Sequence, residues 1–182
     1  MGIGFLTPEI DDLGLAGYLR IMSSTDRPGY DGVLFVVNGV GEPVEFCFSS
    51  IETPRTVLWG RAALRRRANS ELTKALLTAC SSTPVLLLAK AEEVGPETFS
   101  DDIVTSVPTC RLTTRLEAIA VGVSDQEETV DESSEVQVVW SGEAPGMDSP
   151  ARKLLSKLSE IGLLVEPFER AVAGLAEVRQ GE

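Results

Sequence analysis

A hairpin signal in residues 31–49 constrains the fold of this chain more than any other stretch does. Two β-branched and aromatic runs, residues 33–37 and 44–48, flank the segment Asn38-Gly39-Val40-Gly41-Glu42-Pro43. Asparagine and glycine adopt the backbone angles of tight turns at little cost, so this pattern predicts a β-hairpin. The first arm is apolar on both faces, whereas the second alternates with Glu45 and Cys47, which favours a central strand beside a more exposed one. A sheet with apolar faces needs a covering layer, and the rest of the chain must supply it.

Apolar spacing and turn residues predict the other elements. Residues 15–23 fit a strand, with a short helix as the alternative, and residues 55–80 fit either one long helix or two helices that break at Asn69-Ser70. Further strands are expected at residues 85–89, 103–107, 116–123 and 136–140, and helices at residues 149–161 and from 167 onwards. We therefore expect an α/β (α+β) fold: a mixed, largely antiparallel sheet of about five to seven strands, covered by a helix, with a C-terminal helical hairpin.

Changes in composition along the chain predict its domain organisation. Residues 1–140 are expected to form the α/β domain, in which the acidic segment 124–135 is a hairpin tip. Residues 141–148, with glycine and proline, are expected to be a linker, and residues 149–182 a C-terminal helical appendage. Two alternatives remain open for this appendage, because its apolar stripes suit either packing on the sheet or docking in the groove of a partner.

The absence of histidine is the most informative count in the composition. It excludes Ser-His and Cys-His catalysis, imidazole acid–base chemistry and histidine-ligated zinc. The three cysteines, Cys47, Cys80 and Cys110, form no C-x-x-C pair and are expected to be buried free thiols. Neither G-x-x-x-x-G-K-[ST] nor G-x-G-x-x-G occurs. We therefore expect a protein with no catalytic residues, no metal ligands and no cofactor.

The charge of the chain argues against two classes of partner. A net charge of −12 disfavours binding of the whole protein to nucleic acid or to an anionic membrane surface. The first residues lack a basic signal-peptide region, and no apolar run approaches the roughly 20 residues of a membrane span. These features predict a cytoplasmic protein that does not bind membranes.

Basic side chains nevertheless gather on the helix expected at residues 55–74. Six of the sixteen basic residues lie there: Arg55, Arg61, Arg65, Arg66, Arg67 and Lys74. With about 100° of rotation per residue, Arg61 and Arg65 project from the apolar stripe of a continuous helix. A guanidinium is costly to bury without a partner, and arginine beside tryptophan is typical of interface hot spots. The predicted partner-binding residues are therefore Arg61, Arg65, Arg66, Arg67 and Trp59. The alternative is a solvated helix face that pairs with the acidic tip.

These observations favour a non-catalytic adaptor, a hetero-oligomeric subunit of a larger intracellular complex that docks through the basic helix and the C-terminal hairpin. Two alternatives remain. The expected order of elements resembles a ribonuclease-H-like layout, which would imply a degenerate Mg²⁺-dependent nuclease. That fold is known for an acidic residue in the middle of its first strand, and residues 15–23 contain none, so the carboxylates of Asp31, Glu45 and Glu71 would have to converge instead. The other alternative is an accessory subunit that binds nucleic acid through residues 55–74 or through its partner.

Overall fold

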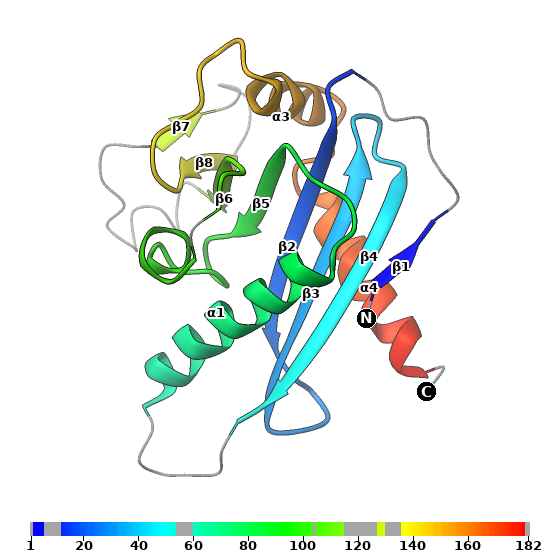
Figure 1. Cartoon of the computed structure of the whole chain (residues 1–182), viewed down its shortest axis with the longest axis vertical. Helices are drawn as coiled ribbons and strands as arrows, with labels where there is room; N and C mark the ends of the chain where they lie inside the picture. Colours follow the sequence, from blue (N-terminus) through cyan, green and yellow to red (C-terminus); the bar gives the residue numbers. More distant parts are fainter. Residues whose placement is uncertain are drawn as a thin grey trace.

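The computed structural model describes residues 2–5, 12–53, 60–103, 105–114, 127–129 and 136–180. Within these ranges the chain forms one eight-stranded sheet with the strand order β1-β4-β3-β2-β5-β6-β8-β7 (Figure 1). The strands are β1 (Gly2–Gly4), β2 (Leu15–Ser23), β3 (Gly29–Asn38), β4 (Pro43–Glu52), β5 (Leu86–Lys90), β6 (Thr109–Thr114), β7 (Glu127–Thr129) and β8 (Val136–Trp140). Only β5 is parallel to its neighbours, β2 and β6. The mixed, largely antiparallel α+β fold predicted from the sequence is confirmed.

The predicted hairpin is formed by β3 and β4. The Asn38 side chain closes its turn by accepting hydrogen bonds from the N–H groups of Val40 and Glu42, at 3.1 and 2.9 Å. Gly41 has a φ of 83°, and a Cβ there would lie 2.3 Å from Leu163 Cδ1, so glycine is required for both its backbone angle and its lack of a side chain. Strand β3 is almost entirely buried at the centre of the three-stranded meander, as its two apolar faces indicated.

Helix α1 (Arg61–Ala79) covers one face of the sheet. It is a single continuous helix, so the predicted alternative of a break at Asn69-Ser70 is wrong. Its buried side chains are Ala68, Asn69, Leu72, Thr73 and Leu76. Asn69 is tolerated there because its Nδ2 donates a 3.1 Å hydrogen bond to the carbonyl oxygen of Glu93. The preceding residues 54–59, which include Arg55 and Trp59, lie outside the described part of the chain.

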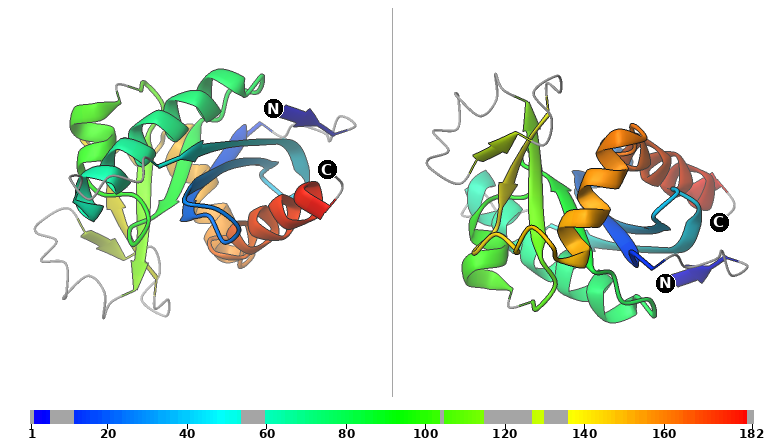
Figure 2. Two further views of the ribbon diagram at one scale, coloured as in Figure 1. Left: turned by 90° about the horizontal axis from the view of Figure 1, so that it is seen from below. Right: turned by 90° about the horizontal axis from the view of Figure 1, so that it is seen from above.

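Helices α3 (Pro150–Glu160) and α4 (Glu166–Gln180) cover the opposite face, so the sheet lies between two helical layers (Figure 2). Leu154, Leu158 and Phe168 are fully buried in the same hydrophobic cluster as the side chains of β2 and β3. The Tyr18 hydroxyl on β2 donates a 2.6 Å hydrogen bond to the carbonyl oxygen of Leu163. The C-terminal helices therefore pack on the sheet, which was one of the two predicted alternatives; the other was docking in the groove of a partner.

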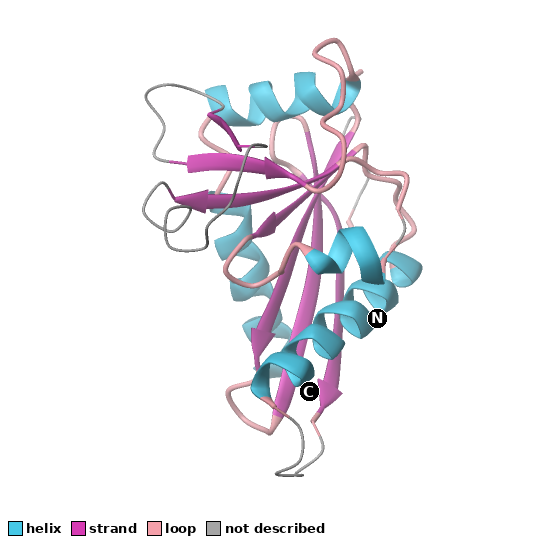
Figure 3. Cartoon of the chain, turned by 90° about the vertical axis from the view of Figure 1, so that its left-hand side faces the viewer, coloured by secondary structure: helices cyan, strands magenta, loops and turns pink. Residues whose placement is uncertain are grey.

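Several segments differ from the prediction. Residues 98–102 form a short π-helical turn, Thr98–Asp102, and the described residues of 103–107 contain no strand. Strands β1 and β6 were not predicted, and a three-residue strand, β7, lies within the acidic segment. The strand predicted at residues 116–123 lies outside the described residues. The sheet is strongly twisted, so that the β6–β8 end runs across the direction of β3 and β4 (Figure 3). Among the described residues, no helix has both the length and the apolar character that crossing a bilayer requires.

Candidate functional site

A surface cleft lies where β2 and β5 end, beside the first turns of α1. Its volume is about 640 Å³, and it is lined by Ile21, Met22, Ser23, Tyr30, Arg61, Ala62, Arg65, Glu92 and Glu93. Strands β2 and β5 are adjacent and parallel. In open sheets, ligands bind preferentially in the crevice outside the carboxyl ends of parallel strands, so this cleft is the first candidate for a functional site.

The structure divides the four predicted arginines into two pairs. Arg61 and Arg65 line the cleft and are exposed, and the Arg65 guanidinium donates a hydrogen bond to the carbonyl oxygen of Glu92. Both lie on the same helical face as the buried side chains of α1, as predicted, but the buried part of that face begins only at Ala68, so the two guanidinium groups are exposed beyond its end.

The second pair is engaged by neighbouring acids. Arg66 binds Asp102 with two hydrogen bonds of 2.9 and 3.0 Å, and Arg67 pairs with Glu71 at 2.7 Å, one turn along the same helix. The four arginines therefore do not form one patch. Trp59, the fifth predicted residue, lies outside the described residues.

Glu93, whose side chain lines the cleft, forms an ion pair with Arg20. Arg20, on β2, donates from Nε to both carboxylate oxygens of Glu93, at 2.8 and 2.7 Å, and its side chain is 12% exposed. The backbone N–H of Ile21 donates a further hydrogen bond of 3.3 Å to the same carboxylate. The Glu93 carboxylate is thus neutralised and saturated with donors, which leaves it poorly suited to hold a cation.

The three carboxylates considered for a Mg²⁺ site do not converge. Asp31 is held by Ser50 at 2.7 Å and by the guanidinium groups of Arg27 and Arg179. Glu71 pairs with a helix neighbour, and Glu45 belongs to a different group of side chains. Within the described ranges, the only three-residue group with ligand atoms close enough to share a metal is Glu45, Cys47 and Cys80. One carboxylate with two thiols does not suit Mg²⁺, which takes oxygen ligands.

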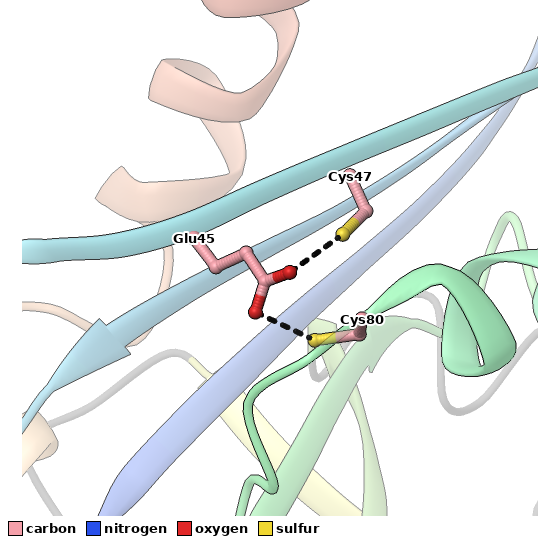
Figure 4. A group of neighbouring side chains, drawn as sticks. All are labelled: Glu45, Cys47 and Cys80. Carbon is pink, nitrogen blue, oxygen red and sulfur yellow. Dashed lines mark hydrogen bonds between the residues drawn. The ribbon is translucent and has the colours of Figure 1, made fainter. Parts of the chain in front are cut away.

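These three residues, which we call the thiol–carboxylate cluster, lie at the other end of α1 (Figure 4). Glu45 and Cys47 are two residues apart on β4 and share one face of the strand, while Cys80 immediately follows α1. Cys47 Sγ lies 3.5 Å from Glu45 Oε1, and Cys80 Sγ lies 3.5 Å from Glu45 Oε2. Sequence reasoning treated the cysteines as separate thiols; the alternation of Glu45 and Cys47 was the one signal that could have joined them.

Backbone groups fix the charge of this cluster. Glu45 is 5% exposed, and it accepts hydrogen bonds from the N–H groups of Ser81, at 2.9 and 3.1 Å, and Ser82, at 2.7 Å. Burial alone would raise its pKa, but these hydrogen bonds outweigh burial and lower the pKa of Glu45 to about 2. Burial, together with the nearby Glu45 charge, raises the pKa of Cys47 to about 11 and that of Cys80 to about 12. The cluster is therefore a carboxylate that accepts hydrogen bonds from two protonated thiols.

Comparison with known proteins gives a likeness of fold alone. No protein-family model matches the sequence, and no curated protein is significantly similar to it. Among solved structures, the endonuclease V of Streptomyces avermitilis aligns over 87% of this chain and 83% of its own, with a TM-score of 0.50 and 11% identity. The endonuclease V of Bacillus subtilis aligns over 92% of this chain and 81% of its own, with a TM-score of 0.49 and 14% identity. The chain thus has a fold that is also found in an endonuclease V.

Proposed function

We propose that this chain is a non-catalytic interaction subunit of a larger assembly, and that the cleft between α1 and the ends of β2 and β5 holds an acidic segment of a protein partner. The observation that carries the proposal is the ion pair that Arg20 forms with Glu93, a side chain of the cleft lining. A metal-dependent nuclease needs carboxylates that are free to bind cations. In this cleft the buried carboxylate, Glu93, is paired with the guanidinium of Arg20, and the other, Glu92, is exposed and lies 3.9 Å from Lys90 Nζ.

The rim of the cleft supports an acidic ligand. Arg61 and Arg65 stand on successive turns of α1, four residues apart, and both are exposed. Arginine binds carboxylates in a planar, two-pronged geometry, and Tyr30 adds an aromatic surface beside them. This combination suits a short segment with an Asp or Glu next to an apolar residue.

The balance of charge favours protein over nucleic acid as the ligand. Arg66 and Arg67 are paired with acids, so the rim offers two guanidinium groups to a ligand rather than four. A nucleic-acid backbone rewards a longer basic track, and the net charge of −12 repels it.

A metal-dependent nuclease is the second candidate function, because the endonuclease V of Streptomyces avermitilis shares the fold. The described carboxylates do not supply the necessary site. The proposal therefore rests on the chemistry of the cleft rather than on the likeness of fold.

The test compares two variants that change the net charge equally. R61E/R65E reverses the cleft rim, while K74E/K153E reverses two exposed lysines away from the cleft. Each tagged protein is expressed in its own host, and the co-purified proteins are quantified. We expect R61E/R65E to lose at least one stoichiometric partner that the wild type and K74E/K153E retain, with all three unfolding at similar temperatures. Retention of every partner by R61E/R65E would overturn the proposal.

A parallel assay separates the alternatives. The wild type is incubated with DNA and RNA in the presence of Mg²⁺ or Mn²⁺, and we expect no cleavage. Cleavage that disappears in E93Q would establish the nuclease instead. Binding of an oligonucleotide that weakens steeply with salt and is lost in R61E/R65E would indicate the nucleic-acid-binding accessory subunit.

A further inference from the structure

We propose that Glu45, Cys47 and Cys80 form a binding site for a thiophilic divalent cation of the zinc class. This site is independent of the cleft, because it lies beyond the opposite end of α1, a helix of about 28 Å. It combines two sulfur donors and one carboxylate, a set of ligand types that zinc accepts and that Mg²⁺ and Ca²⁺ do not.

The donor atoms already converge from two elements of the fold. All three ligand atoms lie within 4.8 Å of one another. Strand β4 fixes two of them, since residues 45 and 47 point to the same face, and the end of α1 fixes the third (Figure 4). Zinc–sulfur bonds are about 2.3 Å long, so the two sulfurs and the carboxylate would draw closer together around the cation.

A glycine faces the cluster from the edge strand β1. A Cβ at Gly2 would lie 3.3 Å from Cys47 Sγ, 3.4 Å from Glu45 Oε1 and 3.3 Å from the carbonyl oxygen of Ala79. Because Gly2 has no side chain, a small space remains there, and a sulfur, a carboxylate oxygen and a carbonyl oxygen surround it. Water or the Ala79 carbonyl can supply the fourth ligand that a tetrahedral site needs.

A purely structural role does not explain the two thiols. The N–H groups of Ser81 and Ser82 hydrogen-bond to both oxygens of Glu45 but, unlike the guanidinium beside Glu93, they carry no net charge, so the negative charge of Glu45 remains available to a cation. A thiol is a weak hydrogen-bond donor, and a hydroxyl would serve Glu45 better in both positions. Two neighbouring sulfurs are good ligands for a soft cation, whereas they add little to a site whose role is only to form hydrogen bonds.

The binding step is balanced by proton release. The cation binds the carboxylate, which is already ionised, and displaces one proton from each thiol, so that two protons pass to the solvent. Zinc binds cysteine as the thiolate, so binding releases protons and the affinity should rise with pH. Cys80 is only half-buried and offers the route of entry.

The test titrates the reduced full chain with Zn²⁺ against a chromogenic chelator. We compare the wild type with C47S, C80S and the matched control C110S, whose thiol is buried on the opposite face of the sheet. We expect one equivalent to bind to the wild type and to C110S, with affinity at least about 100-fold lower in C47S and C80S because a strong thiolate bond is lost. Co²⁺ should add sulfur-to-metal charge-transfer absorption in the wild type and in C110S.

Two further measurements keep the proposal falsifiable if a cysteine variant folds poorly. Zn²⁺ should protect Cys80 of the wild type from alkylation, and G2A should weaken binding because its methyl group fills the point between the donors. The absence of stoichiometric binding in the wild type would overturn the proposal, and so would equal binding by the wild type and the folded C80S protein. An affinity that does not change with pH would also overturn it.

Discussion

The buried carboxylate of Glu45 should make the protein sensitive to acid in a way that E45Q removes. The folded state lowers the pKa of Glu45 from its usual 4.5 to about 2, because the hydrogen bonds from Ser81 and Ser82 outweigh the effect of burial. A lowered pKa means that the folded state prefers the ionised form. The contribution of Glu45 to stability is therefore complete above about pH 5, and it is lost as the pH falls toward 2.

The size of the effect follows from these two values. A pKa of 4.5 in the unfolded chain and about 2 in the folded protein corresponds to about 3 kcal/mol of stability, of which about 2 kcal/mol is lost by pH 3. Urea unfolding, followed by circular dichroism in the presence of a chelator, measures the free energy of unfolding from about pH 7 to about pH 3. The wild type should be more stable than E45Q near neutral pH, and this advantage should shrink by about 2 kcal/mol at pH 3.

The matched control is E177Q, which alters an exposed carboxylate on α4. Its difference from the wild type should stay within about 0.5 kcal/mol across the pH range. The reasoning is refuted if the difference between the wild type and E45Q is the same at pH 7 and pH 3. That result would mean that the hydrogen bonds to Glu45 do not distinguish its charged form from its neutral one.

Three further predictions follow from the packing. R20M should destabilise the protein by about 3 kcal/mol in urea unfolding, because it leaves the Glu93 charge buried without its partner; R20M/E93M should cost less than the sum of the single variants. G41A should lower the free energy of unfolding by about 2 kcal/mol or more, because φ at this position is positive and the new methyl group would meet a leucine side chain. G142A, where φ is positive but the surrounding space is open, should lower it by about 1 kcal/mol. Equal losses in the two variants would contradict the steric part of this reasoning. Cys110 is fully buried, and burial raises its pKa to about 12, so mass spectrometry should find it unmodified by a thiol reagent in the folded protein and modified in denaturant; labelling of the folded protein would contradict the packing.

Local chemistry explains which parts of the fold the sequence could predict. The turn at residues 38–43 was predictable because asparagine and glycine there satisfy its backbone on their own. Strand β6, TCRLTT, was missed because its buried positions hold threonine and arginine as well as apolar residues. Its burial depends on two neighbouring strands and the face of a sheet, which no short window of sequence contains.

The two candidate sites were harder to predict because each joins segments that are far apart in the chain. The cleft needs the ends of β2 and β5 and the start of α1, so Arg61 and Arg65 were identified but their surroundings were not. Glu93 follows the strand predicted at residues 85–89, but its partner Arg20 lies 73 positions earlier in the chain. The buried face of α1 was hard to predict because it includes two polar side chains, Asn69 and Thr73.

The packing of α4 on β2 and β3 has a consequence for how the protein folds during its synthesis. The meander of β2, β3 and β4 is joined by short connections and can form early. The apolar face that Phe168 and its neighbours cover then stays bare until α4 leaves the ribosome, on the order of ten seconds later at typical rates of translation. The nascent chain therefore presents this apolar sheet face to the cell while the segment between β4 and α4 is being synthesised. Docking of α4, which brings Arg179 to Asp31, then covers the face and ends its exposure to chaperones and to aggregation.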